Sequence, residues 1–229
     1  MVEEEFRDKR EFGEGEEELE KNNTNNKRQN NMTDFNFKKE ADRLMQIKGR
    51  TKGSEFKSLG AYILQRYGEK ELLLLEKKMA ELGYPLHFNE IDPLKWYSES
   101  LNVLALIVAK HLFGWKDLFE VGYTSTKFSV GMRLFMRLSS LERILKETSR
   151  TWRKFLDVGT LELVEYNKKE KYTAVRLRDY KTHPDMCRYY AGFFLSVVKY
   201  TQKGKNMTME ETKCMYKGDP YHEYVARWE

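Results

Sequence analysis

ETKCMYKGDPYHEYVARW, residues 211–228 of this 229-residue chain, is the stretch with the clearest structural pattern. Its turn-forming run KGDP at 217–220 separates two β-type segments. The pattern predicts a hairpin with strands over residues 207–215 and 221–228. Alternate residues of a strand share a face, which predicts that the second strand presents one common face through His222, Tyr224, Ala226 and Trp228.

The same stretch holds most of a potential zinc site. Thiolate, imidazole and carboxylate groups are zinc ligands, and four of them complete a structural site. The ligands expected here are Cys187, Glu211, Cys214 and His222. Glu211 lies three residues before Cys214, so the two share a face only if a bulge interrupts the strand; Glu210 is the alternative ligand. The competing interpretation is that both cysteines and His222 are ordinary buried residues.

Upstream of the hairpin, the apolar pattern first has a helical period and then alternates. Helices are expected over residues 56–67, 69–82, 98–113, 126–138 and 140–156. Residues 160–166 and 172–180 are expected to form a second hairpin, with Thr173, Val175 and Leu177 facing inward. A further helix begins at His183-Pro184 and carries Cys187, Ala191, Phe194, Leu195 and Val198 on one stripe. This order predicts an α+β fold in which helices pack on an antiparallel sheet.

Composition divides the chain into two parts. The first forty residues hold twelve acidic and eight basic residues, and residues 22–31 read NNTNNKRQNN. Such a segment buries too little apolar surface to fold alone. We therefore expect residues 1–35 to form a disordered acidic, Asn-rich tail and residues 36–229 to form one domain. The remainder is basic, but its Lys and Arg alternate with Glu, so nucleic acid is an unlikely partner.

No membrane span or signal peptide is recognisable, and two cysteines fit a reducing cytoplasm. We therefore expect a cytoplasmic protein. Nucleotide-binding and hydrolase motifs are not found, and no acid/base pair stands out among the carboxylates. A Cys214–His222 nucleophile pair lacks a third, orienting residue. The sequence accordingly favours a non-enzymatic protein with no catalytic residues.

Aromatic residues give a second candidate site. Small apolar ligands are usually held in a mainly apolar pocket with a few polar groups. The residues expected to line such a pocket are Trp96, Tyr97, His111, Trp152, Tyr190 and Phe194. Aromatic residues at these spacings also occur in an ordinary filled core.

The pattern E-x-x-C-x-x-x-G-D-x-x-H from Glu211 to His222, with Cys187 one helix upstream, resembles the vinyl-4-reductase-like domain. KGSEFKSLGAYILQRYG at 52–68 is similar to the opening helix of that family. The segment IDPLKWYSES at 91–100 resembles a myxobacterial relative of unknown function. This family belongs to a ligand-binding superfamily with haem-NO-binding domains and trafficking-complex subunits.

The resemblance implies a domain that is often dimeric, with a hydrophobic pocket between helices and sheet. Sensor members bind small aromatic molecules and carry zinc on Cys, Glu, Cys and Cys, which implies Cys187, Glu211, Cys214 and His222 here. His222 replaces the last cysteine of the family. The leading hypothesis is a ligand-binding sensor that acts through a protein partner or dimer interface; the alternatives are an interaction scaffold and an accessory protein of tetrapyrrole metabolism. No haem is expected, because the surroundings of His111 do not match a haem-ligating motif.

Overall fold

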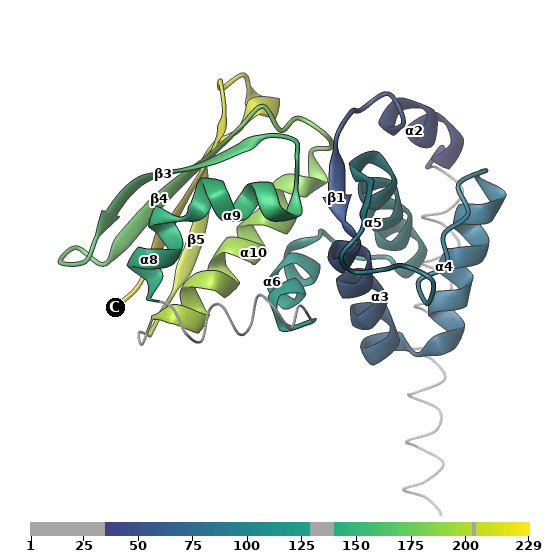
Figure 1. Ribbon diagram of the computed structural model, residues 1–229, viewed down its shortest axis with the longest axis horizontal. Helices are drawn as coiled ribbons and strands as arrows, with labels where there is room; N and C mark the ends of the chain where they lie inside the picture. The colour runs from purple at the N-terminus through teal and green to yellow at the C-terminus, as the bar shows by residue number, and fades with distance from the viewer. Residues whose placement is uncertain (1–34, 129–139, 203–204) are drawn as a thin grey trace, which may run out of the picture.

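A computed structural model describes residues 35–128, 140–202 and 205–229. The sequence interpretation of residues 1–34 as a disordered tail lies outside this range. Figure 1 shows a helical part next to a part built on a sheet. The helical part consists of α2 (Phe37–Leu44), β1 (Arg50–Lys52), α3 (Gly53–Tyr67), α4 (Glu69–Glu81), β2 (Trp96–Ser98) and α5 (Glu99–Phe113). No described helix has the length and apolar character needed to cross a membrane.

The second part follows in chain order. It consists of α6 (Phe119–Phe128), α8 (Leu141–Lys146), α9 (Thr148–Phe155), β3 (Thr160–Asn167), β4 (Tyr172–Arg178), α10 (Asp185–Thr201), β5 (Thr208–Lys213), the 3-10 turn η1 (Met215–Lys217) and β6 (His222–Arg227). The predicted α+β class, with helices packed on an antiparallel sheet, is confirmed.

The four-stranded sheet has the order β3-β4-β6-β5, and every neighbouring pair is antiparallel. Its two hairpins meet where β4 pairs with β6. As the alternation of the sequence predicts, Thr173, Val175 and Leu177 of β4 are buried. The buried set on β6 and beyond is His222, Tyr224, Ala226 and Trp228. This shared face rests on the helices.

Helix α5 is the centre of the helical part. Ser98 caps its N-terminus by accepting a hydrogen bond from the Leu101 N–H at 3.4 Å. Gly114, in the left-handed region, ends it. Most of its residues are buried, as a helix that is apolar on nearly every side should be.

Helix α10 packs against α6 with almost no space between the two backbones. A Cβ atom added to Gly192 of α10 would lie 2.0 Å from the Phe119 carbonyl oxygen. One added to Gly122 of α6 would lie 1.9 Å from the Tyr189 carbonyl oxygen. Glycine is required at both positions because any side chain would collide with main-chain atoms. This contact fixes α10, which carries residues of both candidate sites.

Two helix predictions need correction. The helix expected over residues 140–156 is divided into α8 and α9 at Glu147, whose φ of −94° and ψ of 8° lie outside the helical region. Ser140 caps α8 through a hydrogen bond from the Arg143 N–H at 3.3 Å. The helix expected over residues 126–138 overlaps only the end of α6, and residues 129–139 lie outside the described range.

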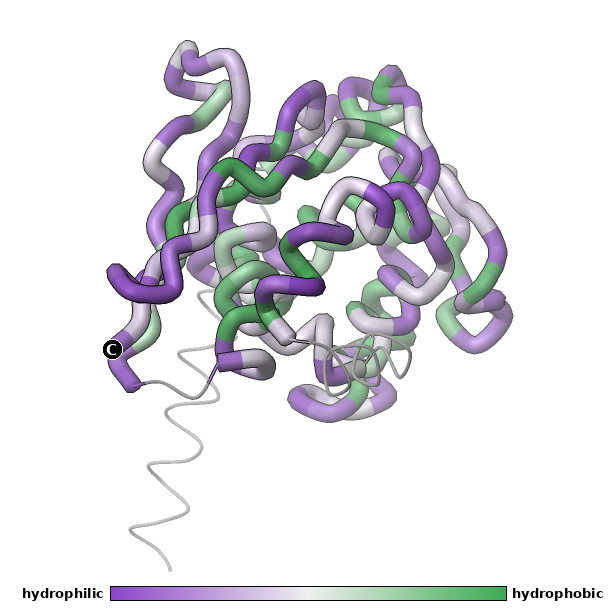
Figure 2. Tube along the Cα trace, turned by 60° about the vertical axis from the view of Figure 1, so that its left-hand side comes forward, coloured by the Kyte–Doolittle hydropathy of each residue, from purple (hydrophilic) through white to green (hydrophobic). Residues whose placement is uncertain are grey.

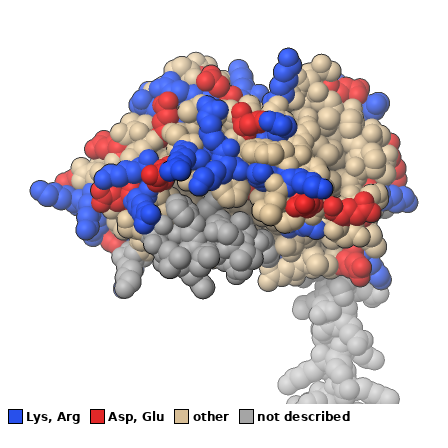
Figure 3. Space-filling view, viewed as in Figure 1, with Lys and Arg blue, Asp and Glu red and all other residues tan. Residues whose placement is uncertain are grey.

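Hydropathy and charge follow this arrangement. In Figure 2 the hydrophobic stretches face the interior, and hydrophilic stretches occupy many of the outer turns. Figure 3 shows Lys and Arg side chains gathered in a band on the face that carries α9, with acidic groups beside them. Arg150, Arg153 and Lys154 of α9 are exposed. The helix layer formed by α8 and α9 is therefore basic outside and, as shown below, lines a cavity inside.

Candidate functional sites

The four predicted zinc ligands lie together at the C-terminal hairpin. One ligand atom from each of Cys187, Glu211, Cys214 and His222 lies within 4.8 Å of all the others. The two sulfur atoms are 3.7 Å apart, and the Cys187 sulfur is 3.7 Å from His222 Nδ1. A tetrahedral zinc with Zn–S bonds of about 2.3 Å holds two sulfur atoms about 3.8 Å apart. The donor set and its spacing therefore fit a zinc ion.

A bulge in β5 brings Glu211 to this cluster. The register with β6 shifts between Glu211 and Lys213, so Glu211 and Cys214 reach the same side of the strand. Glu211 Oε1 lies 2.9 Å from His222 Nδ1, whereas Glu210, the alternative ligand, is exposed. The geometry thus selects Glu211.

The turn after β5 orients Cys214. The Cys214 N–H donates to Asp219 Oδ2 at 2.8 Å, and its carbonyl oxygen accepts from Lys217 and Asp219 N–H groups. Gly218 adopts a φ of 98°, which favours glycine. The Gly-Asp pair of the motif therefore has a structural role: it closes the turn that aims the Cys214 sulfur.

Hydrogen bonding also orients the His222 ring. His222 Nε2 donates to the Tyr180 carbonyl oxygen at 3.1 Å, which fixes the ring with Nδ1 facing the Cys187 sulfur and Glu211 Oε1. Burial raises the pKa of the Cys187 thiol, so this cysteine is protonated unless a cation is bound. Burial also acts to raise the pKa of Glu211, but hydrogen bonds from His222, Cys187 and Cys214 outweigh it and the pKa is lowered.

A cavity of about 110 Å³ lies between the helices and the sheet. Helices α9 and α10 supply half of the residues that line it, and Leu161 of β3 and Val175 of β4 close it on the side of the sheet. Trp152, Tyr190 and Phe194, three of the residues predicted to bind a ligand, line it. The Trp152 indole is fixed by donating to the Val158 carbonyl oxygen at 3.0 Å.

The other three predicted ligand residues lie elsewhere. Trp96 is on β2 between two cations, with Lys52 Nζ 4.2 Å from its ring centroid. The Tyr97 hydroxyl accepts a hydrogen bond from the Asp92 N–H at 2.9 Å. His111 stacks on Phe35 with ring centroids 3.7 Å apart. None of these three side chains lines the cavity.

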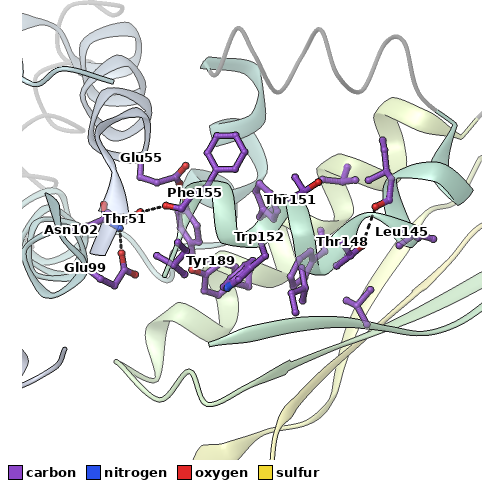
Figure 4. A pocket seen from close by; sticks show the side chains of 18 residues that line it. Thr51, Glu55, Glu99, Asn102, Leu145, Thr148, Thr151, Trp152, Phe155 and Tyr189 are labelled. Carbon is purple, nitrogen blue, oxygen red and sulfur yellow. Dashed lines mark hydrogen bonds between the residues drawn. The ribbon is translucent and has the colours of Figure 1, made fainter. Parts of the chain in front are cut away.

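Sequence reasoning missed the polar end of the cavity. Figure 4 shows Glu55 of α3 and Glu99 of α5 at one end, with Leu145 and Thr148 toward the other. Glu99 is 0% exposed; it accepts from the Tyr180 hydroxyl at 2.6 Å and from Asn102 Nδ2 at 3.2 Å. The Tyr189 hydroxyl donates to Glu55 at 3.2 Å.

Burial raises the pKa of both carboxyl groups, that of Glu99 to about 8. No pair stood out among the carboxylates of the sequence, so these two residues were not identified from it. One feature of the sequence could have indicated that Glu99 is buried: it lies in the first turn of a helix that is apolar on nearly every side.

Among known proteins, solved structures share this fold. The H-NOX protein from S. oneidensis in the Fe(II)NO state superposes with a TM-score of 0.56 at 12% identity, covering 78% of this chain and 99% of that one. A mutant of the H-NOX protein from K. algicida in the unliganded Fe(II) state gives 0.54 at 10% identity, with coverage of 78% and 96%. A structure described as probing heme distortion in the H-NOX family gives 0.54 at 12% identity, with 78% and 95%. No family model and no curated protein matches the sequence.

This comparison corrects one prediction. The sequence interpretation expected no haem, but the fold is that of H-NOX domains, including proteins described by their Fe(II) and heme states. The exclusion of haem is therefore withdrawn. Haem iron is held by His, Cys, Met or Tyr, and Tyr189 and Tyr190 are the cavity-lining residues of these types within the described ranges. A cavity of about 110 Å³ is small beside the roughly 300–1,000 Å³ of drug-sized sites, so haem would require it to widen.

Proposed function

We propose that this protein is a small-molecule-binding sensor or regulatory domain, related to the vinyl-4-reductase-like family, that holds an apolar ligand in the cavity between α9, α10 and the sheet. The observation that carries the proposal is the cavity itself. An engineered apolar cavity of about 150 Å³ in another protein binds benzene, and about 110 Å³ is of the same order. A scaffold with a filled core would leave no such space.

Zinc is the second part of the proposal. In this role Cys187, Glu211, Cys214 and His222 bind one zinc ion, which joins α10 to the terminal hairpin. The support is the spacing of the donor atoms and the orientation of His222 by the Tyr180 carbonyl oxygen. A closed four-ligand site of this kind is structural, because no position is left for a substrate.

Haem is a second candidate for the cavity, and the fold favours testing it. Tyr189 or Tyr190 would be the protein ligand in that case. Such a protein would act as a gas or redox sensor. A visible absorption spectrum of the purified protein separates the two candidates, because haem has an intense Soret band and a small apolar ligand does not.

Native mass spectrometry of protein purified without added metal tests the proposal. We expect one zinc per chain and a further organic mass, in a homodimer that passes its signal to a protein partner. A chain of bare mass, with no metal and no organic molecule after exposure to small aromatic compounds, would reject the sensor in favour of the scaffold.

A further inference from the structure

The two carboxyl groups at the end of the cavity retain unused hydrogen-bonding capacity. Each carboxylate offers about four acceptor positions. Glu99 uses positions for Tyr180, Asn102 and Thr51, and Glu55 uses one for Tyr189. Both residues line the cavity. A ligand there can therefore donate hydrogen bonds to either carboxyl group.

Among the described residues, no positive charge at this end of the cavity balances these acids. Within residues 35–128, 140–202 and 205–229, no Lys, Arg or His lies within hydrogen-bond or ion-pair distance of either carboxyl group. The other titratable groups that face the pair are Tyr180, Tyr189 and Tyr190, and burial raises the pKa of all three well above its usual value. These hydroxyls remain neutral and cannot compensate the acids.

Burial is the main reason that the pKa of Glu99 is raised, and the charge of Glu55 raises it further. Glu99 is buried and Glu55 is half-buried, and two carboxylates in such surroundings are destabilising when close to each other unless one takes up a proton or a cation neutralises them. The protein supplies no such cation among the described residues. A ligand can supply it.

We propose that the cavity selects a small apolar molecule carrying one protonated amine, with the ammonium group facing Glu55 and Glu99 and the hydrocarbon part against Trp152 and Phe194. This inference rests on the proposed function and names its ligand class. An ammonium group brings three donors and one positive charge to the acidic end. A carboxylate ligand of the same size would place a third acid there and is excluded.

Four probes with the same ring test the proposal: benzylamine, benzyl alcohol, toluene and benzoate. Each is titrated by calorimetry into the full-length protein at pH 8, where benzylamine is protonated and a large fraction of Glu99 is ionised. A hydrogen bond to a charged group is worth about 1.5–3 kcal/mol, which is about tenfold or more in affinity. We therefore expect benzylamine to bind at least about tenfold more tightly than toluene or benzyl alcohol, and benzoate not to bind.

Two substitutions test whether the carboxyl groups of Glu55 and Glu99 cause the preference for an amine. Glu99→Gln and Glu55→Gln should each remove most of the preference for benzylamine over toluene. If Glu99→Gln does not fold, Glu55→Gln alone provides the test. The matched control is Glu170→Gln, because Glu170 is exposed in the turn between β3 and β4. Toluene binding without a preference for benzylamine would overturn the amine inference and leave the proposed function intact. Absence of binding by all four probes would overturn both.

Discussion

Replacing Glu99 by Gln is the most direct test of the buried acid. The side chain is 0% exposed, and burial raises its pKa from 4.5 to about 8 despite hydrogen bonds from Tyr180 and Asn102. The folded protein therefore retains a proton that the unfolded chain releases above pH 4.5. Since the unfolded state binds fewer protons in this range, stability falls as the pH rises from about 4.5 to about 8.

The magnitude follows from the gap between the two pKa values. Each unit corresponds to about 1.4 kcal/mol. At pH 7 the unfolded glutamate is about 2.5 units above its pKa of 4.5 while the folded one is still mostly protonated. The ionisation of this one group therefore lowers the free energy of unfolding by about 3 kcal/mol between pH 4 and pH 7, and by about 5 kcal/mol above pH 8. Glutamine is neutral at every pH, so the free energy of unfolding of the Glu99→Gln variant does not include this decrease.

Urea unfolding of the wild type and Glu99→Gln at several pH values between 5 and 8 gives the measurement. At pH 5 the variant should be equal to the wild type or about 1 kcal/mol less stable, because its amide changes the hydrogen bonds to Tyr180 and Asn102. At pH 8 it should be more stable by several kcal/mol. Glu170→Gln controls for the chemical change at an exposed position. A stability difference that stays constant from pH 5 to pH 8 would refute the reasoning.

Three further substitutions test other parts of the structure. Cys214→Ser should abolish stoichiometric zinc and lower the melting temperature, since a bound metal stabilises only the folded state; equal melting temperatures with and without a chelator in the wild type would count against the site. Gly192→Ala places a Cβ 2.0 Å from the Phe119 carbonyl oxygen, so urea unfolding should show a loss of at least about 1–3 kcal/mol; wild-type stability would contradict the close α6–α10 contact. Trp152→Ala should cost about 3–5 kcal/mol and admit larger aromatic probes in the same titrations; unchanged selectivity would show that Trp152 does not limit the cavity.

The terminal hairpin was predictable because its information is local. Alternation placed the buried face of β6 correctly, and the run KGDP marked the turn between the strands. The condition set for Glu211, a bulge in its strand, is met by the register shift before Lys213. The types of donor residue and their spacing were therefore sufficient to predict this cluster from the sequence. That the cluster binds a metal remains a prediction.

The cavity required tertiary information. Its acidic end joins α3 and α5, and much of its wall comes from α9 and α10, which begin more than thirty residues after α5 ends. Aromatic content alone could not distinguish Trp152, which lines the cavity, from Trp96, which lies between Arg50 and Lys52. The division between α8 and α9 at Glu147 was not predictable either, because glutamate is an ordinary helix former and nothing in the local sequence marks a break.

One residue connects the two candidate sites. The Tyr180 carbonyl oxygen accepts from His222 Nε2 at 3.1 Å, and its hydroxyl donates to Glu99 at 2.6 Å. A metal that fixes the His222 ring thereby restricts Tyr180, and Tyr180 in turn orients the acid that faces a ligand. Coupling of this kind is reciprocal, so a ligand that tightens this contact should also tighten metal binding. Titration of benzylamine before and after chelation measures it: weaker binding to the metal-free protein is expected, and equal affinities would mean that the two sites act independently.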